Sequence, residues 1–299
     1  MSPQHRLRWL AAVAAVVLLA AGCAQQAPVR GRTVRIGVGS TDEQRVLAAL
    51  TIAALDRVGI AVEPRTELGG TRRLRQEARR GAIDLYWDYT GAAWALGLGQ
   101  QGPPADPGES YERVHDADAR QGLTWLDPTR ANATLALFVR AANRPEEGTL
   151  TALARVLSAG GRRLCADSDF IDRPAGYEAL ADEYSIRQLI PLRRATERQA
   201  IAGVADGTCL AGLATATSGE AVRAGLVPVA DDQRVFPAFI VAPVARADVL
   251  DRLPEIADAL RPVTSALTTL SLSQLNAQLI AGADPQALAE AFLAGGPTR

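Results

Sequence analysis

Histidine and lysine are nearly missing from this chain of 299 residues, which has two histidines and no lysine. Arginine therefore carries all of its permanent positive side-chain charge. His5 lies close to the N-terminus, so His115 stands alone in the rest of the chain, within a charged segment that predicts a solvated position. A histidine-based catalytic triad or a histidine-rich metal site would have only one member available. We expect no enzyme activity, no metal site and no cofactor.

An excess of charge of either sign is also missing. The chain has 33 acidic and 32 basic side chains, which gives a net charge of −1 at neutral pH. Nucleic-acid binding and adsorption to anionic membranes usually depend on a basic excess or a basic block. We therefore expect no nucleic-acid partner.

The chain has a single long apolar run, Trp9–Ala21, which follows Arg6 and Arg8. It is too short to span a bilayer and has the form of a secretory signal. The small residues 20–22 precede Cys23, as in a bacterial lipobox. We therefore predict a signal peptide at 1–22, lipidation of Cys23 and a tether at 23–32. An ordinary secretory signal with an incidental cysteine is the alternative.

From residue 33 onward, strand patterns alternate with helix patterns. Val34, Ile36 and Val38 alternate as in a strand, the polar residues 40–44 can cap a helix, and 45–58 has helical spacing. Units of this kind predict parallel sheets with helices on their faces, an α/β fold. Further strands are expected at 60–62, 83–86, 164–166, 187–192, 209–214, 226–230 and 238–244, with helices over 248–294.

The two strand-and-helix blocks predict two lobes. We expect residues 33–132 and 238–299 in the first lobe and 133–237 in the second. Ligands of parallel sheets bind beyond the C-terminal ends of the strands. The turns at those ends are Gly39–Thr41, Tyr86–Gly91, Asp167–Arg173 and Thr215–Ser218, and we expect them to face each other across a cleft.

Several motifs give the chain a family resemblance. Gly81–Gly91, Trp125–Pro128, Asp169–Arg173, Asp231-Asp232 and Phe236–Pro243 occur in a characteristic order and spacing. Over residues 34–292 the chain resembles the glycine betaine/choline (osmoprotectant) substrate-binding proteins of ABC importers. The resemblance implies a two-lobe type II periplasmic-binding-protein fold with the ligand cleft between the lobes.

The resemblance also implies site residues. In this family an aromatic cage surrounds a quaternary ammonium and an arginine holds a carboxylate; Tyr89 matches a cage position and Arg173 matches the arginine. The remaining candidates are Ser40, Thr41, Trp87, Thr90, Thr215 and Thr217. Tyr89 could instead be a core residue, and Arg173 could be a surface residue paired with a neighbouring aspartate. Trp87 could equally pack in the core.

The match is incomplete where the family has its aromatic cage. Other cage positions fall near Leu135, Ile201 and Thr215, none of them aromatic, and a family lysine is replaced by Thr41. Trp87, Trp94, Tyr177 or Phe239 could supply the missing rings. We therefore expect an osmoprotectant-class solute, with weaker binding of glycine betaine than is usual in the family.

The predicted lipidation of Cys23 and the resemblance together predict a lipoprotein outside the cytoplasmic membrane. It would act as a monomer, held to the membrane by its N-terminal lipid, and would pass a small zwitterionic or carboxylate-bearing solute to an ABC permease and its ATPase. The alternative is a lipoprotein that keeps the fold but senses an envelope ligand or binds a partner protein. An open polar and aromatic cleft would favour transport, and a cleft filled by bulky side chains would favour a structural role.

Cys165 and Cys209 are the remaining cysteines if Cys23 is lipidated. Export permits oxidation. Cys165 falls in the first strand that we predict for the second lobe and Cys209 in the third, and these are neighbours in sheets of order 2-1-3. We predict a disulfide between them. Two buried free thiols in adjacent strands are the alternative.

Overall fold

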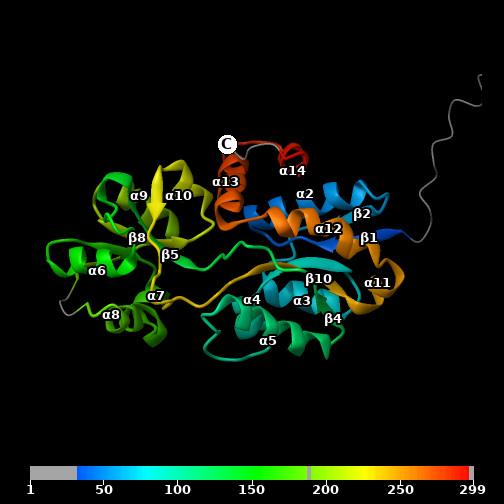
Figure 1. The fold of residues 1–299 in the computed structure, drawn as a ribbon, viewed down its shortest axis with the longest axis horizontal. Coiled ribbons are helices and arrows are strands. Elements are labelled where there is room, and N and C mark those ends of the chain that lie inside the picture. Colours follow the sequence, from blue (N-terminus) through cyan, green and yellow to red (C-terminus); the bar gives the residue numbers. More distant parts are fainter. Residues whose placement is uncertain (1–31, 187–189, 296–299) are drawn as a thin grey trace, which may run out of the picture. The chain divides into compact units, whose positions relative to one another are not determined.

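The computed structural model describes residues 32–186 and 190–295. The described residues from Val34 onward form one compact unit. This unit contains two five-stranded sheets with helices packed on them (Figure 1). The predicted signal peptide, Cys23 and nearly all of the predicted tether lie outside the described residues. Within residues 32–186 and 190–295, no helix has both the length and the apolar character that a bilayer crossing requires.

The first sheet has the strand order β2-β1-β3-β10-β4. β1 is parallel to β3, whereas β10 is antiparallel to both β3 and β4. Its strands are β1 (Thr33–Gly37), β2 (Ala61–Arg65), β3 (Leu85–Tyr89), β4 (Leu123–Trp125) and β10 (Val241–Arg246).

The second sheet has the order β7-β6-β8-β5-β9. β6 is parallel to β7 and β8, and β5 is antiparallel to β8 and β9. Its strands are β5 (Leu135–Arg140), β6 (Leu164–Ala166), β7 (Leu192–Arg194), β8 (Ala211–Thr215) and β9 (Leu226–Pro228).

The prediction of an all-parallel sheet in each lobe is therefore wrong, because β10 and β5 each run against their neighbours. Both strands enter their sheet directly from the other sheet. The chain passes from β4 to β5 through 126–134 and from β9 to β10 through 229–240. A strand that arrives in this way needs no helical crossover, which parallel neighbours do require. β4 and β5 were also not predicted.

Helices cover both faces of each sheet. Side chains of Thr41, Thr196 and Ser218 accept hydrogen bonds from the first turns of α2, α9 and α10, so local polar residues determine where these helices begin. The longer helices are α2 (Asp42–Asp56), α3 (Thr71–Arg79), α5 (Pro107–Ala119), α6 (Leu150–Ser158), α9 (Glu197–Ala205), α12 (Glu255–Ala266), α13 (Thr269–Ile280) and α14 (Pro285–Leu293). The shorter ones are α4 (Thr90–Ala92), α7 (Ser168–Asp172), α8 (Ala179–Glu183), α10 (Gly219–Arg223) and α11 (Ala247–Arg252), with helical turns η1 (Ala93–Gly97), η2 (Ala141–Asn143) and η3 (Pro174–Glu178).

Alternation along β3 explains how the first sheet is buried on both faces. Leu85 and Trp87 belong to the core shared with α2 and α12, whereas Tyr86 belongs to the core on the opposite face, shared with α3 and α5. Successive side chains of a strand point to opposite faces, so a continuous apolar strand is expected when both faces are covered.

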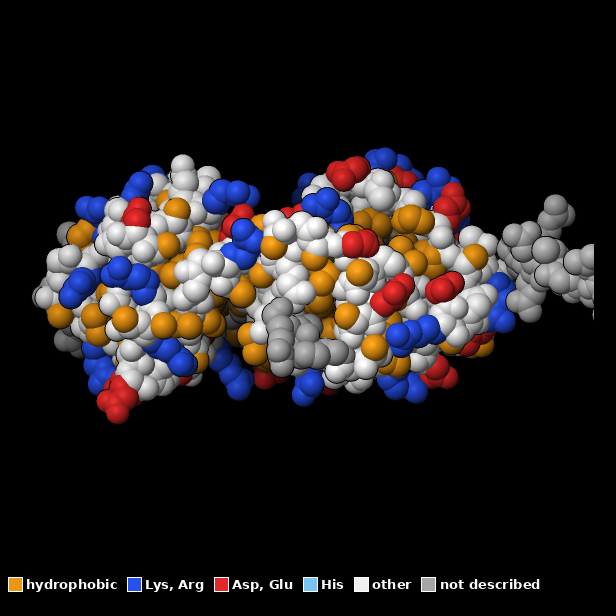
Figure 2. All heavy atoms as spheres, turned by 90° about the horizontal axis from the view of Figure 1, so that it is seen from above, with side chains coloured by type: hydrophobic (Ala, Val, Ile, Leu, Met, Phe, Trp, Pro, Cys, Tyr) orange, Lys and Arg blue, Asp and Glu red, His pale blue; other side chains and the backbone are white. Residues whose placement is uncertain are grey.

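Over the face seen in Figure 2, basic and acidic side chains are interspersed.

The second sheet places the two cysteines together. Cys165 lies in β6 and Cys209 lies just before β8, and the structure joins them by a disulfide with a Cα–Cα distance of 5.9 Å. β6 lies between β7 and β8, the 2-1-3 arrangement used to predict the pair. α9 covers the bond: a Cβ at Gly203 would lie 3.2 Å from the Cys165 sulfur, so glycine allows the close approach.

We expect protein purified from an oxidising compartment to contain this disulfide. The bond closes a loop with a sequence separation of 44, and the chain-entropy model assigns such a loop roughly 4 kcal/mol. The double variant C165A/C209A should lose up to this much unfolding free energy in urea titrations. Alkylation of both thiols in the unreduced wild-type protein, followed by mass spectrometry, would show that the bond is absent.

A buried ion pair stabilises the first lobe behind α3. Arg75 is 4% exposed and donates to Asp118 at 2.7 Å, and its guanidinium lies 3.6 Å from Asp88. Asp118 also accepts a hydrogen bond from the indole of Trp125 at 2.7 Å. The network therefore ties α3, β3, α5 and β4 together. Removing one member of a buried pair leaves a charge without its partner.

Arg75→Met should lower the unfolding free energy by about 3–5 kcal/mol, because it leaves Asp118 and Asp88 without their cation. Arg79→Met, on the exposed side of the same helix, is the control and should change it by less than about 0.5 kcal/mol. Urea titration measures both. Equal effects of the two substitutions would contradict the role assigned to Arg75.

Candidate solute-binding site

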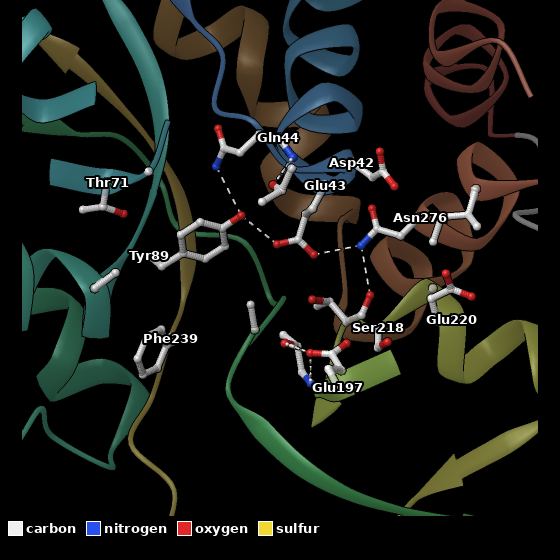
Figure 3. A pocket seen from close by; sticks show the side chains of 18 of the residues that line it. Asp42, Glu43, Gln44, Thr71, Tyr89, Glu197, Ser218, Glu220, Phe239 and Asn276 are labelled. Atoms are coloured by element: carbon white, nitrogen blue, oxygen red, sulfur yellow. Dashed lines mark hydrogen bonds between the residues drawn. The ribbon is translucent and has the colours of Figure 1, made fainter. Parts of the chain in front are cut away.

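A cavity of about 450 Å³ lies where the C-terminal ends of β3 and β8 meet the first turns of α2, α3, α9 and α10 (Figure 3). Both sheets and α13 contribute to it. Its lining is Thr41, Asp42, Glu43, Gln44, Gly69, Gly70, Thr71, Leu74, Tyr89, Ala92, Ala133, Glu197, Thr215, Thr217, Ser218, Gly219, Glu220, Phe239, Asn276 and Ile280.

Tyr89, the last residue of β3, is fixed in the cavity by two hydrogen bonds of its hydroxyl. Its hydroxyl donates to Glu43 Oε1 at 2.7 Å and accepts from Gln44 Nε2 at 3.2 Å. Burial raises the pKa of Tyr89 well above its ordinary value, and the neighbouring Glu43 raises it further. The phenol therefore stays protonated at neutral pH and donates to Glu43.

Glu43 connects three parts of the fold. Its Oε2 accepts from Asn276 Nδ2 of α13 at 2.8 Å, and the same Nδ2 donates to the Thr217 carbonyl at 2.9 Å. Burial raises the pKa of Glu43, while hydrogen bonds from Thr217, Tyr89 and Asn276 lower it and nearby Glu197 raises it. The first lobe, α13 and the turn after β8 thus meet at one carboxylate.

The cavity is acidic. Asp42, Glu43, Glu197 and Glu220 all line it, and the described lining residues include no arginine and no histidine. Glu197 Oε2 accepts from the backbone and hydroxyl of Thr215 at 3.2 and 3.0 Å. Within the described ranges, no group of three or more potential ligand side chains could hold a metal ion. The carboxylates that line the cavity favour a positively charged group over a negatively charged one.

Two aromatic rings face these carboxylates. Tyr89 and Phe239 lie on one side of the cavity, with Glu197 and Glu220 on the other (Figure 3). Gly91 makes room for Phe239: a Cβ at this position would lie 2.5 Å from the ring. The glycine of the Tyr-Thr-Gly motif is therefore required by packing at the cavity wall.

Asp88 positions the cavity wall from behind. It is fully buried, and its Oδ1 accepts from the Tyr89 backbone N–H at 2.9 Å and from the Thr71 hydroxyl at 2.8 Å. Burial raises the pKa of Asp88 to about 6, while Arg75 acts to lower it. Asp88 therefore orients the end of β3 and the start of α3 and does not line the cavity.

The structure brings four of the predicted site residues to the cavity and leaves others elsewhere. Thr41, Tyr89, Thr215 and Thr217 line it. Ser40, Trp87 and Thr90 do not line the cavity and instead stabilise the surrounding structure. The Ser40 hydroxyl accepts from Gly69 N–H at 3.2 Å, Thr90 is buried and bonds to the Ala238 carbonyl at 3.2 Å, and Trp87 packs in the core with its indole donating to Thr51 at 2.7 Å. For Trp87 the core alternative is the one that the structure supports.

Arg173 is not brought to the cavity. It is an exposed residue at the C-terminal end of α7, and it does not belong to the lining. The neighbouring Asp172 forms its ion pair with Arg194, at 2.6 Å, and not with Arg173. Within residues 32–186 and 190–295, Arg173 takes part in no ion pair. Of the rings proposed as substitutes, Phe239 lines the cavity. Trp94 does not; its ring lies against the Arg113 guanidinium, and its indole N–H donates to the Gln101 carbonyl.

Sequence reasoning missed the polar centre of the site. Glu43 and Gln44 follow Thr41 in a segment that also satisfies a helix-capping pattern, so the local pattern explained them without a ligand. Asn276 lies 233 residues from Glu43, in a helix with no motif. The missed signal was a glutamate at the start of α2, directly after the turn that follows β1, the strand that pairs with β3.

Comparison with known proteins gives a consistent result. The family profile described as the substrate binding domain of the ABC-type glycine betaine transport system matches residues 32–295. A glycine-betaine-binding protein of Pseudomonas aeruginosa is 33% identical over 292 residues, covering 92% of this chain and 90% of that protein. The glycine betaine-binding protein YehZ of Escherichia coli is 30% identical over 282 residues, covering 87% and 89%.

The fold agrees as well. The structure of apo YehZ from Escherichia coli superposes with a TM-score of 0.81 at 27% identity, covering 89% of this chain and 99% of that one. The predicted two-lobe binding-protein fold is thereby confirmed. Substrate-binding proteins of ABC importers bind solutes outside the cytoplasmic membrane and are not enzymes. The chain belongs to the family of substrate-binding domains of ABC-type glycine betaine transport systems.

Proposed function

We propose that this protein captures a small osmoprotectant-class solute with a cationic head group and delivers it to an ABC permease and its ATPase. It works as a monomer outside the cytoplasmic membrane, held there by lipid on Cys23. The apolar run before Cys23 and the small residues that precede it support the anchor. Two of its relatives are named for glycine betaine binding, which supports the solute class.

The observation that carries this proposal is the placement of Tyr89 beside Glu43 in a cavity between strand ends of both sheets. An aromatic ring and a carboxylate are the two groups that attract a cation most strongly in a partly dry site. The volume of about 450 Å³ is in the usual range for a small-molecule site.

A cavity of this kind also separates the proposal from its alternative. A binding-protein fold kept for a structural role would fill its cleft with bulky side chains. Here the lining is mainly small or polar, with Phe239 and Tyr89 as its aromatic members among the described residues. The cavity is therefore available to a solute.

The direct test is a thermal-shift screen of choline, glycine betaine, carnitine, amino acids, polyols and sugars against a chain that begins at Ala24. A ligand that binds only the folded state raises the apparent stability. Stabilisation by one of the first three supports the proposal. Stabilisation by a sugar or polyol alone would overturn it.

Glycine betaine should bind more weakly than micromolar. Each desolvated cation–π contact contributes about 1–2 kcal/mol, so a cage that lacks three rings loses roughly 3–6 kcal/mol. Phe239 restores at most part of that loss. Calorimetry with the purified protein measures the constant, and a value of about 1 µM or below would contradict this expectation.

A role for Arg173 remains a proposal that depends on movement of the second lobe about the segments 126–134 and 229–240. Arg173→Ala should then weaken carnitine and glycine betaine binding by about tenfold, because a charge-assisted bond to the carboxylate is lost. Choline, which has no carboxylate, should bind unchanged. Arg162→Ala, exposed in the same lobe, is the control. Unchanged affinity for all three solutes in calorimetry would remove Arg173 from the site.

A further inference from the structure

We infer that Glu43 is the countercharge for the cationic group of the solute, and that the cavity therefore prefers a net cation to a zwitterion with the same head group. This inference rests on the proposed function and names the charge class of the solute. It assigns the specificity to a carboxylate instead of an aromatic cage.

The first step is the way in which Glu43 is held. One of its oxygens accepts from the Tyr89 hydroxyl at 2.7 Å and the other from Asn276 Nδ2 at 2.8 Å. A trimethylammonium group has no N–H to donate, so its attraction to this carboxylate would come from charge and not from a further hydrogen bond. Because Tyr89 bonds to Glu43 directly, a cation that contacts this carboxylate also lies close to the phenol ring (Figure 3). The two groups therefore act on the same part of the solute.

The second step is the charge balance of the lining. Asp42 pairs with Arg45, and Glu220 pairs with Arg198 at 3.0 Å. Glu43 and Glu197, by contrast, form no ion pair within residues 32–186 and 190–295; their hydrogen bonds come from the neutral groups of Tyr89, Asn276, Thr217 and Thr215. Glu197 is exposed to water, whereas Glu43 is partly buried, and a carboxylate removed from water is costly unless hydrogen bonds or a positive charge compensate it. The cavity thus lacks positive charge that a cationic solute would supply.

The third step concerns the solute's own carboxylate. A zwitterion brings a negative group into a lining with four carboxylates and no arginine or histidine among its described residues. Like charges at close range oppose binding. Choline and glycine betaine share a trimethylammonium group, but only glycine betaine carries this negative charge. We therefore expect choline to bind more tightly.

The test compares choline, glycine betaine and 3,3-dimethylbutan-1-ol, the uncharged carbon analogue of choline, by calorimetry on a chain that begins at Ala24. Choline should bind at least about tenfold more tightly than glycine betaine, and the neutral analogue should bind at least about tenfold more weakly than choline. Glu43→Gln should reduce choline affinity by about tenfold or more and narrow its advantage over the neutral analogue. Glu109→Gln, which removes an exposed carboxylate of α5 that pairs with Arg113, is the matched control and should change neither.

The outcomes separate the two proposals. If choline or glycine betaine binds but glycine betaine is the tighter, or if Glu43→Gln keeps the affinity for choline, the inference is overturned and the proposed function stands. If none of the osmoprotectants binds, both are overturned. Thermal unfolding of Glu43→Gln shows whether the variant is folded; if it is not, the three-ligand comparison on the wild-type protein decides the charge preference alone.

Discussion

The pairing of β1 with β3 is the constraint on which the site depends. The two strands are parallel neighbours, with Ile36 opposite Leu85 and Gly37 opposite Tyr86. Their C-terminal ends therefore reach the same edge of the sheet. The turn after β1 leads to Glu43 at the start of α2, and β3 ends at Tyr89, so two residues 46 apart in sequence come within 2.7 Å. Everything else in the cavity is arranged around that contact.

A second layer of interactions keeps this contact in place. Asp88 holds the backbone of Tyr89 and the hydroxyl of Thr71 at once, and Arg75 connects Asp88 to Asp118. The cavity wall is thus tied to the buried ion pair of the first lobe. On the other side, Asn276 links Glu43 to the turn after β8. Glu43 therefore holds the end of β3 through Tyr89 and also connects the first lobe to the second through Asn276.

The alternation of strands and helices was sufficient to predict the α/β class, the two sheets and the neighbouring strands of Cys165 and Cys209. It was not sufficient to predict strand direction, because β5 and β10 arrive from the other sheet and long-range pairing decides how they run. In the site, the motif around Tyr89 located the right strand end. It could not separate Tyr89 from Trp87, since both lie on the same side of β3 and only the end of the strand reaches the cavity. Glu43 and Asn276 became visible only through the fold.

The chain crosses between the two sheets twice, from β4 to β5 and from β9 to β10. These crossings limit the order in which the two sheets can form. In the first sheet, β10 lies between β3 and β4, and β4 has β10 as its neighbour. The strands β5 to β9 of the second sheet, by contrast, are consecutive along the chain. When the chain is synthesised from its N-terminus, the second sheet has all its strands once residue 228 has been added. The early strands of the first sheet are made sooner. That sheet cannot form completely until β10 (residues 241–246), which lies between β3 and β4, has been made. The lobe that begins the sequence is therefore the last whose sheet can close.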